Sequence, residues 1–298
     1  MEWLYEKNAG TSRKIFCICN YIGLILLCVI FLLPVWHVAM GSISDPLMVS
    51  ANNGLILKPL GKATLGGYKL VMSNSSIIRS YLNTFIYVIA ATFLGLVLNI
   101  LGAYVLARRN VLFKGFIAGL ITFTMIFNGG LIPTYIMIRN LHLLDTRWAM
   151  ILPGALSAYN IIIMRTSFAA IPEELFEAAR IDGAGNLRIL LQIVLPVSKS
   201  IIAVIVLFYA IQHWNSWFNA SIYLTKRELY PLQLTLREIV LLASENSIVA
   251  DVDGSDVEIY RPLIKYATIM VSIIPMMIIY PFVQKYFVSG VMIGSVKG

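Results

Sequence analysis

The sequence is poor in charged residues. Asp, Glu, Lys and Arg make up 13% of the 298 residues, whereas about a quarter is usual for a soluble domain. Hydrophobic residues account for 59%, and the mean hydropathy is +0.81. A chain with so little charge cannot cover a water-exposed surface with polar groups, so an ordinary soluble domain is excluded. The composition predicts an integral membrane protein.

Cysteine and histidine are scarce as well, with three residues of each. The cysteines lie in or beside one apolar segment and form neither a metal-ligand set nor a disulfide framework. The histidines are far apart in the sequence and have no paired ligand spacing, so we expect packed or interfacial side chains and no metal site. These residues are Cys17, Cys19 and Cys28, and His37, His142 and His213.

Motifs for catalysis and nucleotide binding are also missing. Gly61-Lys62 is followed by Ala63 and lacks a glycine five residues earlier, so it is not a phosphate-binding loop. No serine or cysteine nucleophile motif is visible. The acidic residues 251–258 resemble a calcium loop, but the glycine comes too early, which favours a solvated acidic loop. The chain is therefore not expected to be an enzyme or to bind a cofactor itself.

Six segments are apolar enough to cross a bilayer, which takes roughly 20 residues each. The first follows a basic start like that of a signal peptide, but its apolar run is about twice the usual 7–15 residues, so we expect a retained helix. The fold class predicted is all-α integral membrane, with a single domain of six transmembrane helices. The predicted spans are residues 15–40, 83–106, 116–138, 148–168, 201–218 and 267–287.

Basic residues predict the orientation. Arg108, Arg109 and Lys114 crowd the short connection between the second and third spans, and such loops face the cytoplasm. This orientation places both termini, the loop 169–198 and the tail 288–298 in the cytoplasm. The segment 219–265 is then external, and it contains an amphipathic helix predicted at residues 232–242.

Residues 171–196 form the only long segment that mixes acids, arginines and glycines. Pro172 suits the first turn of a helix, and Gly183 suits the left-handed residue that follows a helix ending near Asp182. Asn186 is expected to cap a second helix that meets Pro196. In the first helix, the predicted apolar face holds Leu175, Phe176 and Ala179, and the polar face holds Glu173, Glu177 and Arg180.

The predicted spans contain amides but almost no ionisable side chains, which argues against an ion-driven carrier. Most of these amides are expected to join helices. A second interpretation is that some line a path for a polar, uncharged solute. The best candidates are Gln212, Trp214, Asn215 and Trp217, because aromatic faces beside amides suit sugars; the tryptophans would equally suit a membrane-interface belt. The amides are Asn83, Asn99, Asn128, Asn160, Gln212 and Asn215.

The spacing of residues 177–196 supports a family resemblance. Glu177-Ala178-Ala179, three residues, Gly183, nine residues and then Ile193-x-Leu195-Pro196 matches the pattern E-A-A-x3-G-x9-I-x-L-P. This pattern resembles the signature of binding-protein-dependent ABC importer permeases. The six-span layout and the tail 290–298 are similar to the smaller permease subunit of maltose-type importers. Residues 128–135, 152–155 and 214–218 look like the branch that handles complex oligosaccharides.

The resemblance implies roles for the loop and the tail. In this family the signature loop is a coupling helix that docks in a cleft of the ATP-binding subunit. Glu177 would pair with a basic residue there, Ala178 and Ala179 would permit close contact, and Gly183 would allow the turn. Arg180, Asp182 and Pro196 would belong to the same interface, and the tail residues Gly294, Val296, Lys297 and Gly298 would reach between two ATPase subunits.

The resemblance therefore predicts a type I ABC importer permease in a bacterial plasma membrane. It would work with a second permease subunit, two ATP-binding subunits that hold ATP and Mg²⁺, and an extracellular solute-binding lipoprotein. The expected solute is an oligosaccharide, and no nucleic acid is expected as a partner. The alternatives are an ABC permease for amino acids or peptides, a secondary carrier that works alone, and a membrane scaffold without transport activity.

Overall fold

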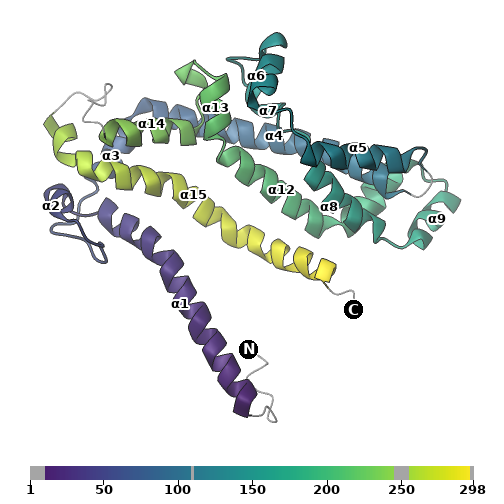
Figure 1. Cartoon of the computed structure of the whole chain (residues 1–298), viewed down its shortest axis with the longest axis horizontal. Helices are drawn as coiled ribbons and strands as arrows, with labels where there is room; N and C mark the ends of the chain where they lie inside the picture. Colours follow the sequence, from purple (N-terminus) through teal and green to yellow (C-terminus); the bar gives the residue numbers. More distant parts are fainter. Residues whose placement is uncertain (1–10, 109–110, 245–254, 296–298) are drawn as a thin grey trace. The chain divides into compact units, whose positions relative to one another are not determined.

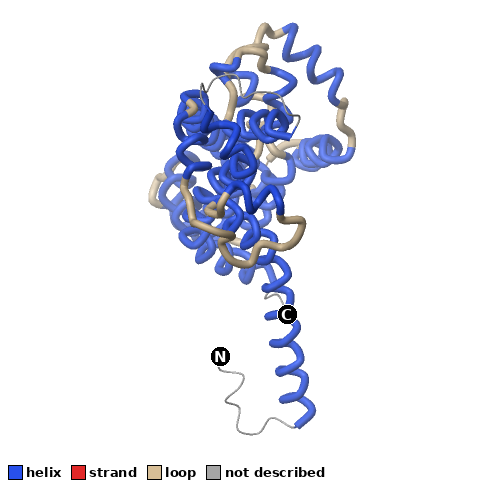
Figure 2. The backbone as a smooth tube through the Cα atoms, turned by 90° about the vertical axis from the view of Figure 1, so that its left-hand side faces the viewer, coloured by secondary structure: helices blue, strands red, loops and turns tan. Residues whose placement is uncertain are grey.

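The chain is represented by a computed structural model that describes residues 11–108, 111–244 and 255–295. Within these residues the structure consists of helices and connecting loops, without a strand (Figure 2). The chain divides into two compact units, one made of Met1–Asn74 with Ile239–Val271 and the other of Ser75–Glu238 with Ser272–Gly298. The all-helical prediction is confirmed.

Three helices of the described residues are each long and apolar enough to cross a membrane. They are α1 (Thr11–Ser42), α4 (Ser75–Ala107) and the apolar part of α15 (Ser255–Ser295) (Figure 1). These helices contain the first, second and sixth predicted spans. The number of described spans rises to as many as five if each of two bent helix pairs counts as one.

The first bent pair replaces the third predicted span. α5 (Lys114–Ile126) and α6 (Leu131–Asn140) meet at 111° instead of forming one straight helix. Gly130 between them has a φ of +87°, outside the helical region, and its N–H donates to Asn128 Oδ1 at 2.9 Å. This local turn gives the chain an alternative to helical hydrogen bonding and causes the break.

The fourth and fifth predicted spans are interrupted too. The fourth consists of α7 (Trp148–Ile151) and α8 (Ala158–Ala169), with residues 152–157 unwound between them. Ser157 caps α8 by accepting the N–H of Asn160 at 3.3 Å. In place of the fifth, α12 (Lys199–Trp214) ends before α13 (Trp217–Tyr223) begins. The second bent pair is formed at the other end of α12, where it meets the segment Asn186–Val197 at 86°.

The core of the larger unit forms where α4 packs against α8 and α12 (Figure 1). Tyr209 of α12 is fully buried there, and its hydroxyl donates to the carbonyl of Ala155 at 3.0 Å. Asn99 of α4 donates from Nδ2 to the same hydroxyl and, at 2.6 Å, to the carbonyl of Gly95. Asn99 therefore joins helices, as predicted for the amides.

A second buried amide ties α4 to a loop. Asn83 Nδ2 donates to the carbonyls of Glu228 and Tyr230 at 2.7 and 3.2 Å, and Tyr87 donates to the carbonyl of Leu229 at 2.7 Å. The loop contains the short helix η3 (Arg227–Leu229) and leads into α14 (Leu232–Ser244), which confirms the predicted amphipathic helix. Of the acidic stretch predicted as a loop, residues 251–254 lie outside the described residues and residues 255–258 begin α15.

The smaller unit has its own core. α2 (Pro46–Ala51) and the loop before α3 (Gly66–Ser73) contribute Val49 and Ile56, which pack with Leu263. His37 accepts the N–H of Ile56 at 2.9 Å through Nδ1. This histidine is a structural side chain, as the sequence predicted.

Candidate functional site

α9 (Glu173–Ile181) is the short helix that the sequence predicted before Gly183. Pro172 precedes it, and Glu173 and Glu174 place negative charge in its first turn, where the helix dipole favours acids. Gly183 has a φ of +76°, and its N–H donates back to the last turn of α9 at 3.0 Å. Gly183 confirms the predicted end of the helix, whereas Pro172 lies one residue before the helix, at the N-cap position, and not in its first turn as predicted.

The start of the next helix differs from the prediction. Gly185, at φ −71° and ψ 164°, is the extended residue before α10 (Asn186–Ile189), and Asn186 is already helical. A capping side chain must belong to the extended residue, so the assignment of Asn186 as the cap is wrong. Glycine takes this position without a side-chain hydrogen bond.

α9 has one buried and one exposed face. Phe176 and Ala179 are buried, whereas Leu175, which the sequence placed on the apolar face, is 44% exposed. Leu175 lies about 100° around the helix from Phe176, which turns it away from the core. The exposed face holds Glu174, Glu177, Ala178 and Ile181 at i, i+3, i+4 and i+7 spacing. The predicted coupling residues Arg180, Asp182 and Gly183 are also exposed.

The chain after α10 contains a wide helical turn. Residues Leu190–Val194 form the π-helix η2, in which the N–H of Leu195 donates to the carbonyl of Leu190, and α11 (Leu195–Val197) follows. Pro196 has no N–H to donate, and a π-turn just before it shifts the hydrogen-bonding pattern to accommodate this loss. Pro196 itself is exposed, while Ile189, Leu190 and Val194 anchor the segment in the core.

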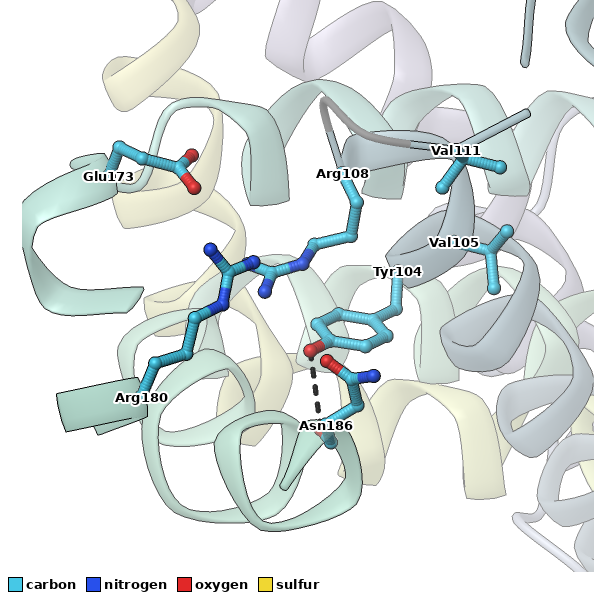
Figure 3. Close-up of a pocket in the computed structure, with 7 residues that line it drawn as sticks. All are labelled: Tyr104, Val105, Arg108, Val111, Glu173, Arg180 and Asn186. Carbon is cyan, nitrogen blue, oxygen red and sulfur yellow. Dashed lines mark hydrogen bonds between the residues drawn. The ribbon is translucent and has the colours of Figure 1, made fainter. Parts of the chain in front are cut away.

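A pocket of about 320 Å³ lies behind α9. Arg108, the first residue after α4, places its guanidinium 4.3 Å from the ring centre of Phe176 and 5.4 Å from that of Tyr104, within the range of cation–π contacts. The Tyr104 hydroxyl donates to the carbonyl of Asn186 at 3.2 Å. α9 is thus held against the end of α4. The pocket is lined by Tyr104, Val105, Arg108, Val111, Glu173, Arg180 and Asn186 (Figure 3).

Sequence reasoning missed this use of Arg108 and treated it only as a charge that sets the orientation. An arginine that directly follows an apolar span was the available signal. Its partner Phe176 could not be named, because the two residues are far apart in the sequence and meet only through packing.

The four predicted solute-path residues do not lie together. Gln212 and Asn215 line a pocket of about 210 Å³, but Trp214 is 3% exposed and packs against Phe85 at 6.0 Å between ring centres. Trp217 lies under the guanidinium of Arg237 at 3.6 Å. The other lining residues come from α7 and the break after it, and from the end of α12, the link to α13 and α13 itself: Ala149, Met150, Pro153, Gly154, His213, Ser216, Phe218 and Asn219.

Asp145 connects two loops in a way that the sequence did not indicate. Its carboxylate accepts the N–H and, at 2.6 Å, the hydroxyl of Thr225, as well as the N–H of Lys226 at 3.1 Å. Its own N–H donates to the carbonyl of Tyr223 at 3.0 Å, and its φ is +56°. The hydrogen bonds from Thr225 hold the pKa of Asp145 below its usual value.

The lowered pKa of Asp145 predicts that its hydrogen bonds to Thr225 and Lys226 depend on pH. Because the folded pKa lies below the unfolded value of 3.8, the stabilisation is complete above that value and is lost as the pH falls through the folded pKa. We expect Asp145→Ala to increase cleavage by trypsin after Lys226 at neutral pH, because the loop is no longer held. When loop opening is instead followed by hydrogen exchange of the Thr225 and Lys226 amides, the difference from the wild type should shrink as the pH falls below 3.8. Equal cleavage of both proteins at neutral pH would contradict the prediction.

The remaining predicted site residues lie in the tail. Gly294 belongs to the last turn of α15, and Val296, Lys297 and Gly298 lie outside the described residues. Among the residues that the structure describes, no group of three or more His, Cys, Asp and Glu side chains could hold a metal ion.

No protein-family model matches the chain. Protein LplC of Bacillus subtilis is 35% identical over 298 residues, which cover the full length of both chains. The polygalacturonan/rhamnogalacturonan transport system permease protein YtcP of the same organism is 36% identical over 287 residues, covering 96% of this chain and all of YtcP.

A solved structure gives the same result. One chain in the crystal structure of a bacterial ABC transporter involved in the import of the acidic polysaccharide alginate superimposes with a TM-score of 0.83. The two chains are 32% identical, and the match covers 94% of this chain and 99% of the other. The similarity to relatives over nearly the whole chain and the shared helical fold agree with the signature in residues 177–196. The chain therefore belongs to the family of ABC sugar-importer permeases, in the branch that contains LplC and YtcP.

Proposed function

We propose that this chain is one permease subunit of a heterodimeric importer that moves oligosaccharides across the plasma membrane. An extracellular binding protein delivers the solute, and two separate ATP-binding subunits hold ATP and Mg²⁺ and supply the energy. The observation that carries the proposal is α9, which exposes Glu177 and Ala178 while Phe176 and Ala179 fix its other face to the core. The sugar solutes named for YtcP and for the alginate transporter support the solute class.

The proposed orientation places α9 and both termini in the cytoplasm. The connection between α4 and α5 supports it, because basic residues gather in this short loop. Lys114 Nζ donates to the carbonyl of Arg108 at 2.9 Å, so both cations lie at the same end of the helices.

Coupling would follow from how α9 is held. An ATPase subunit that pairs with Glu177 and packs closely on Ala178 would move α9 when it closes on ATP. Because Phe176 is buried and stacks on Arg108 at the end of α4, this displacement would reach α4. α4 packs on α8 and α12, so the helices would move together, as close-packed elements do.

The proposed solute path passes the pocket lined by Gln212, Asn215 and Asn219. Its wall includes Pro153 and Gly154 from the unwound segment between α7 and α8, and unwound backbone in a membrane is tolerated where it lines a cavity. Among the residues that the structure describes, no Lys, Arg, Asp or Glu lines this pocket. Amides suit sugar hydroxyls, whereas amino acids or peptides would need partners for their charges. The lining therefore favours a neutral sugar over amino acids or peptides, and an acidic sugar would likewise need partners for its charges.

The proposal predicts that Glu177→Ala reduces both solute uptake and binding-protein-stimulated ATP hydrolysis by about tenfold, the loss expected for one charged contact at an interface. The measurement is ATPase activity of the complex purified with its binding protein, together with uptake in cells. The matched control is Glu228→Ala, because the side chain of Glu228 is also exposed but lies on η3.

Full stimulated activity in Glu177→Ala would refute the coupling role. Uptake that persists after removal of the ATP-binding subunits would instead support a carrier that works alone.

A further inference from the structure

The pocket behind α9 contains more positive charge than its own residues neutralise. Two guanidinium groups, from Arg108 and Arg180, line it together with a single carboxylate, that of Glu173 (Figure 3). Nη1 and Nη2 of Arg108 are buried and have no hydrogen-bond partner among the described residues. Buried donors without acceptors are costly, by roughly 1–3 kcal/mol each and more for charged groups. The pocket can therefore take an acceptor from outside the described residues.

The guanidinium of Arg108 is positioned to bind such an acceptor. Its guanidinium is fixed on the ring of Phe176, and the neighbouring ring of Tyr104 is fixed by its hydrogen bond to Asn186. Arg180 reaches the same pocket from α9, one turn after Phe176. Two cations that share a pocket repel each other unless an anion lies between them. A fixed guanidinium fork matches the oxygens of a phosphate group.

The position of the pocket favours a lipid as the source of that phosphate. Arg108 directly follows Ala107, the last residue of a helix long and apolar enough to cross a membrane. The side chains of Leu101 and Val105 precede Arg108 at i, i+4 and i+7 spacing, and they are 46% and 45% exposed. An apolar strip thus leads to a cationic pocket, and basic pockets at the ends of membrane helices bind anionic head groups.

We propose that this pocket binds a phosphate group, with Arg108 and Arg180 as its ligands, and that an anionic phospholipid supplies it. Its volume of about 320 Å³ lies at the lower end of the range for ligand sites, roughly 300–1,000 Å³. A bound head group would bridge α4 and α9. Binding can be measured without transport, so the test does not depend on the proposed coupling role of α9.

The experiment uses the importer purified with its co-expressed subunits, delipidated in detergent and titrated with phosphatidylglycerol or with inorganic phosphate. Binding is followed by native mass spectrometry and calorimetry. Arg108→Gln and Arg180→Gln should each weaken phosphatidylglycerol binding by about tenfold or more, the loss expected for charge-assisted hydrogen bonds. The matched control is Arg188→Gln, because Arg188 lies outside this pocket and donates to Gln192 Oε1 at 2.9 Å.

The two titrations identify the source of the phosphate. Binding of phosphatidylglycerol that inorganic phosphate does not displace supports a lipid site. Binding of inorganic phosphate with the same dependence on Arg108 and Arg180 keeps the phosphate site but refutes the lipid as its source. If Arg108→Gln does not assemble because the stacking on Phe176 is lost, Arg180→Gln decides alone, since Arg180 is exposed.

Three results would overturn the proposal. The first is unchanged binding in the assembled variants of Arg108 and Arg180. The second is an equal loss in Arg188→Gln, which would indicate nonspecific attraction to a basic surface. The third is binding that occurs only after the ATP-binding subunits are removed, which would indicate that a side chain of those subunits fills the pocket.

Discussion

Gly95→Ala is expected to destabilise the permease severely. A Cβ atom at Gly95 would lie 2.7 Å from Cζ of Tyr209 and 2.9 Å from the carbonyl oxygen of Ala155. The Ala155 oxygen belongs to the backbone, so no side-chain rotation can move it away. Overpacking of a core typically costs about 1–3 kcal/mol. If the Tyr209 ring is displaced, its hydrogen bonds to Ala155 and Asn99 are lost as well, and each unpaired buried group costs about 1–3 kcal/mol more.

The measurement is the midpoint of thermal unfolding of the purified complex, together with its yield. Gly102→Ala is the matched control, because it makes the same substitution in the same helix. A Cβ there would lie 3.4 Å from the end of the Ile161 side chain, which is ordinary contact with a group that can move. We expect the control to unfold near the wild-type temperature. An unchanged midpoint in Gly95→Ala would mean that α4 and α12 do not pack as described.

Gly154→Leu is expected to abolish uptake while the complex still assembles. A Cβ at Gly154 would lie 3.4 Å from Gln212 Nε2 and 3.4 Å from His213 Cε1, so the side chain would enter the pocket near these groups without striking backbone. The pocket of about 210 Å³ would then hold leucine in place of solute. We expect uptake to fall by at least about tenfold, because a side-chain group that does not fit beside a solute in its pocket reduces activity on that scale.

The control for this prediction is Gly129→Leu, since Gly129 lies between α5 and α6, outside the pocket, and a Cβ there has only ordinary contact with Pro133 at 3.9 Å. The readouts are uptake of labelled oligosaccharide and binding-protein-stimulated ATPase activity. Loss of uptake with preserved ATPase activity is the expected pattern. Normal uptake in Gly154→Leu would place the solute path elsewhere, and joint loss of activity and assembly would indicate a structural role.

The ends of α9 could be predicted because their signals are local. Pro172 and Gly183 act through their own backbone conformations, which the sequence specifies without knowledge of distant contacts. The breaks at residues 127–130 and 152–157 do contain turn-forming residues, Asn128-Gly129-Gly130 and Pro153-Gly154. They were still not predicted, because membrane helices tolerate glycine and proline. Asn186 was assigned as a cap by residue type, but the extended conformation fell one residue earlier, at Gly185.

In the candidate site, too, features set by the local sequence could be predicted and features set by packing between distant segments could not. The spacing from Glu177 to Pro196 is a property of the sequence, and it indicated the family that full-length relatives confirm. The surroundings of each side chain depend on packing between distant segments. Trp214 looked like a sugar platform beside Asn215, but it is covered by Phe85 of α4. Arg108 looked like a topology signal, but it stacks on Phe176.

The π-turn at Leu190–Val194 has a consequence for how the loop deforms under load. Its backbone hydrogen bonds span five residues, as from Leu195 to Leu190, and such turns are rare insertions in otherwise regular helices. A displacement of α9 would pass along the chain through this irregular turn before it reaches the regular helix α12. Together with the 86° bend between Asn186–Val197 and α12, this makes Leu190–Val194 a place where the connection is expected to deform more readily than a regular helix.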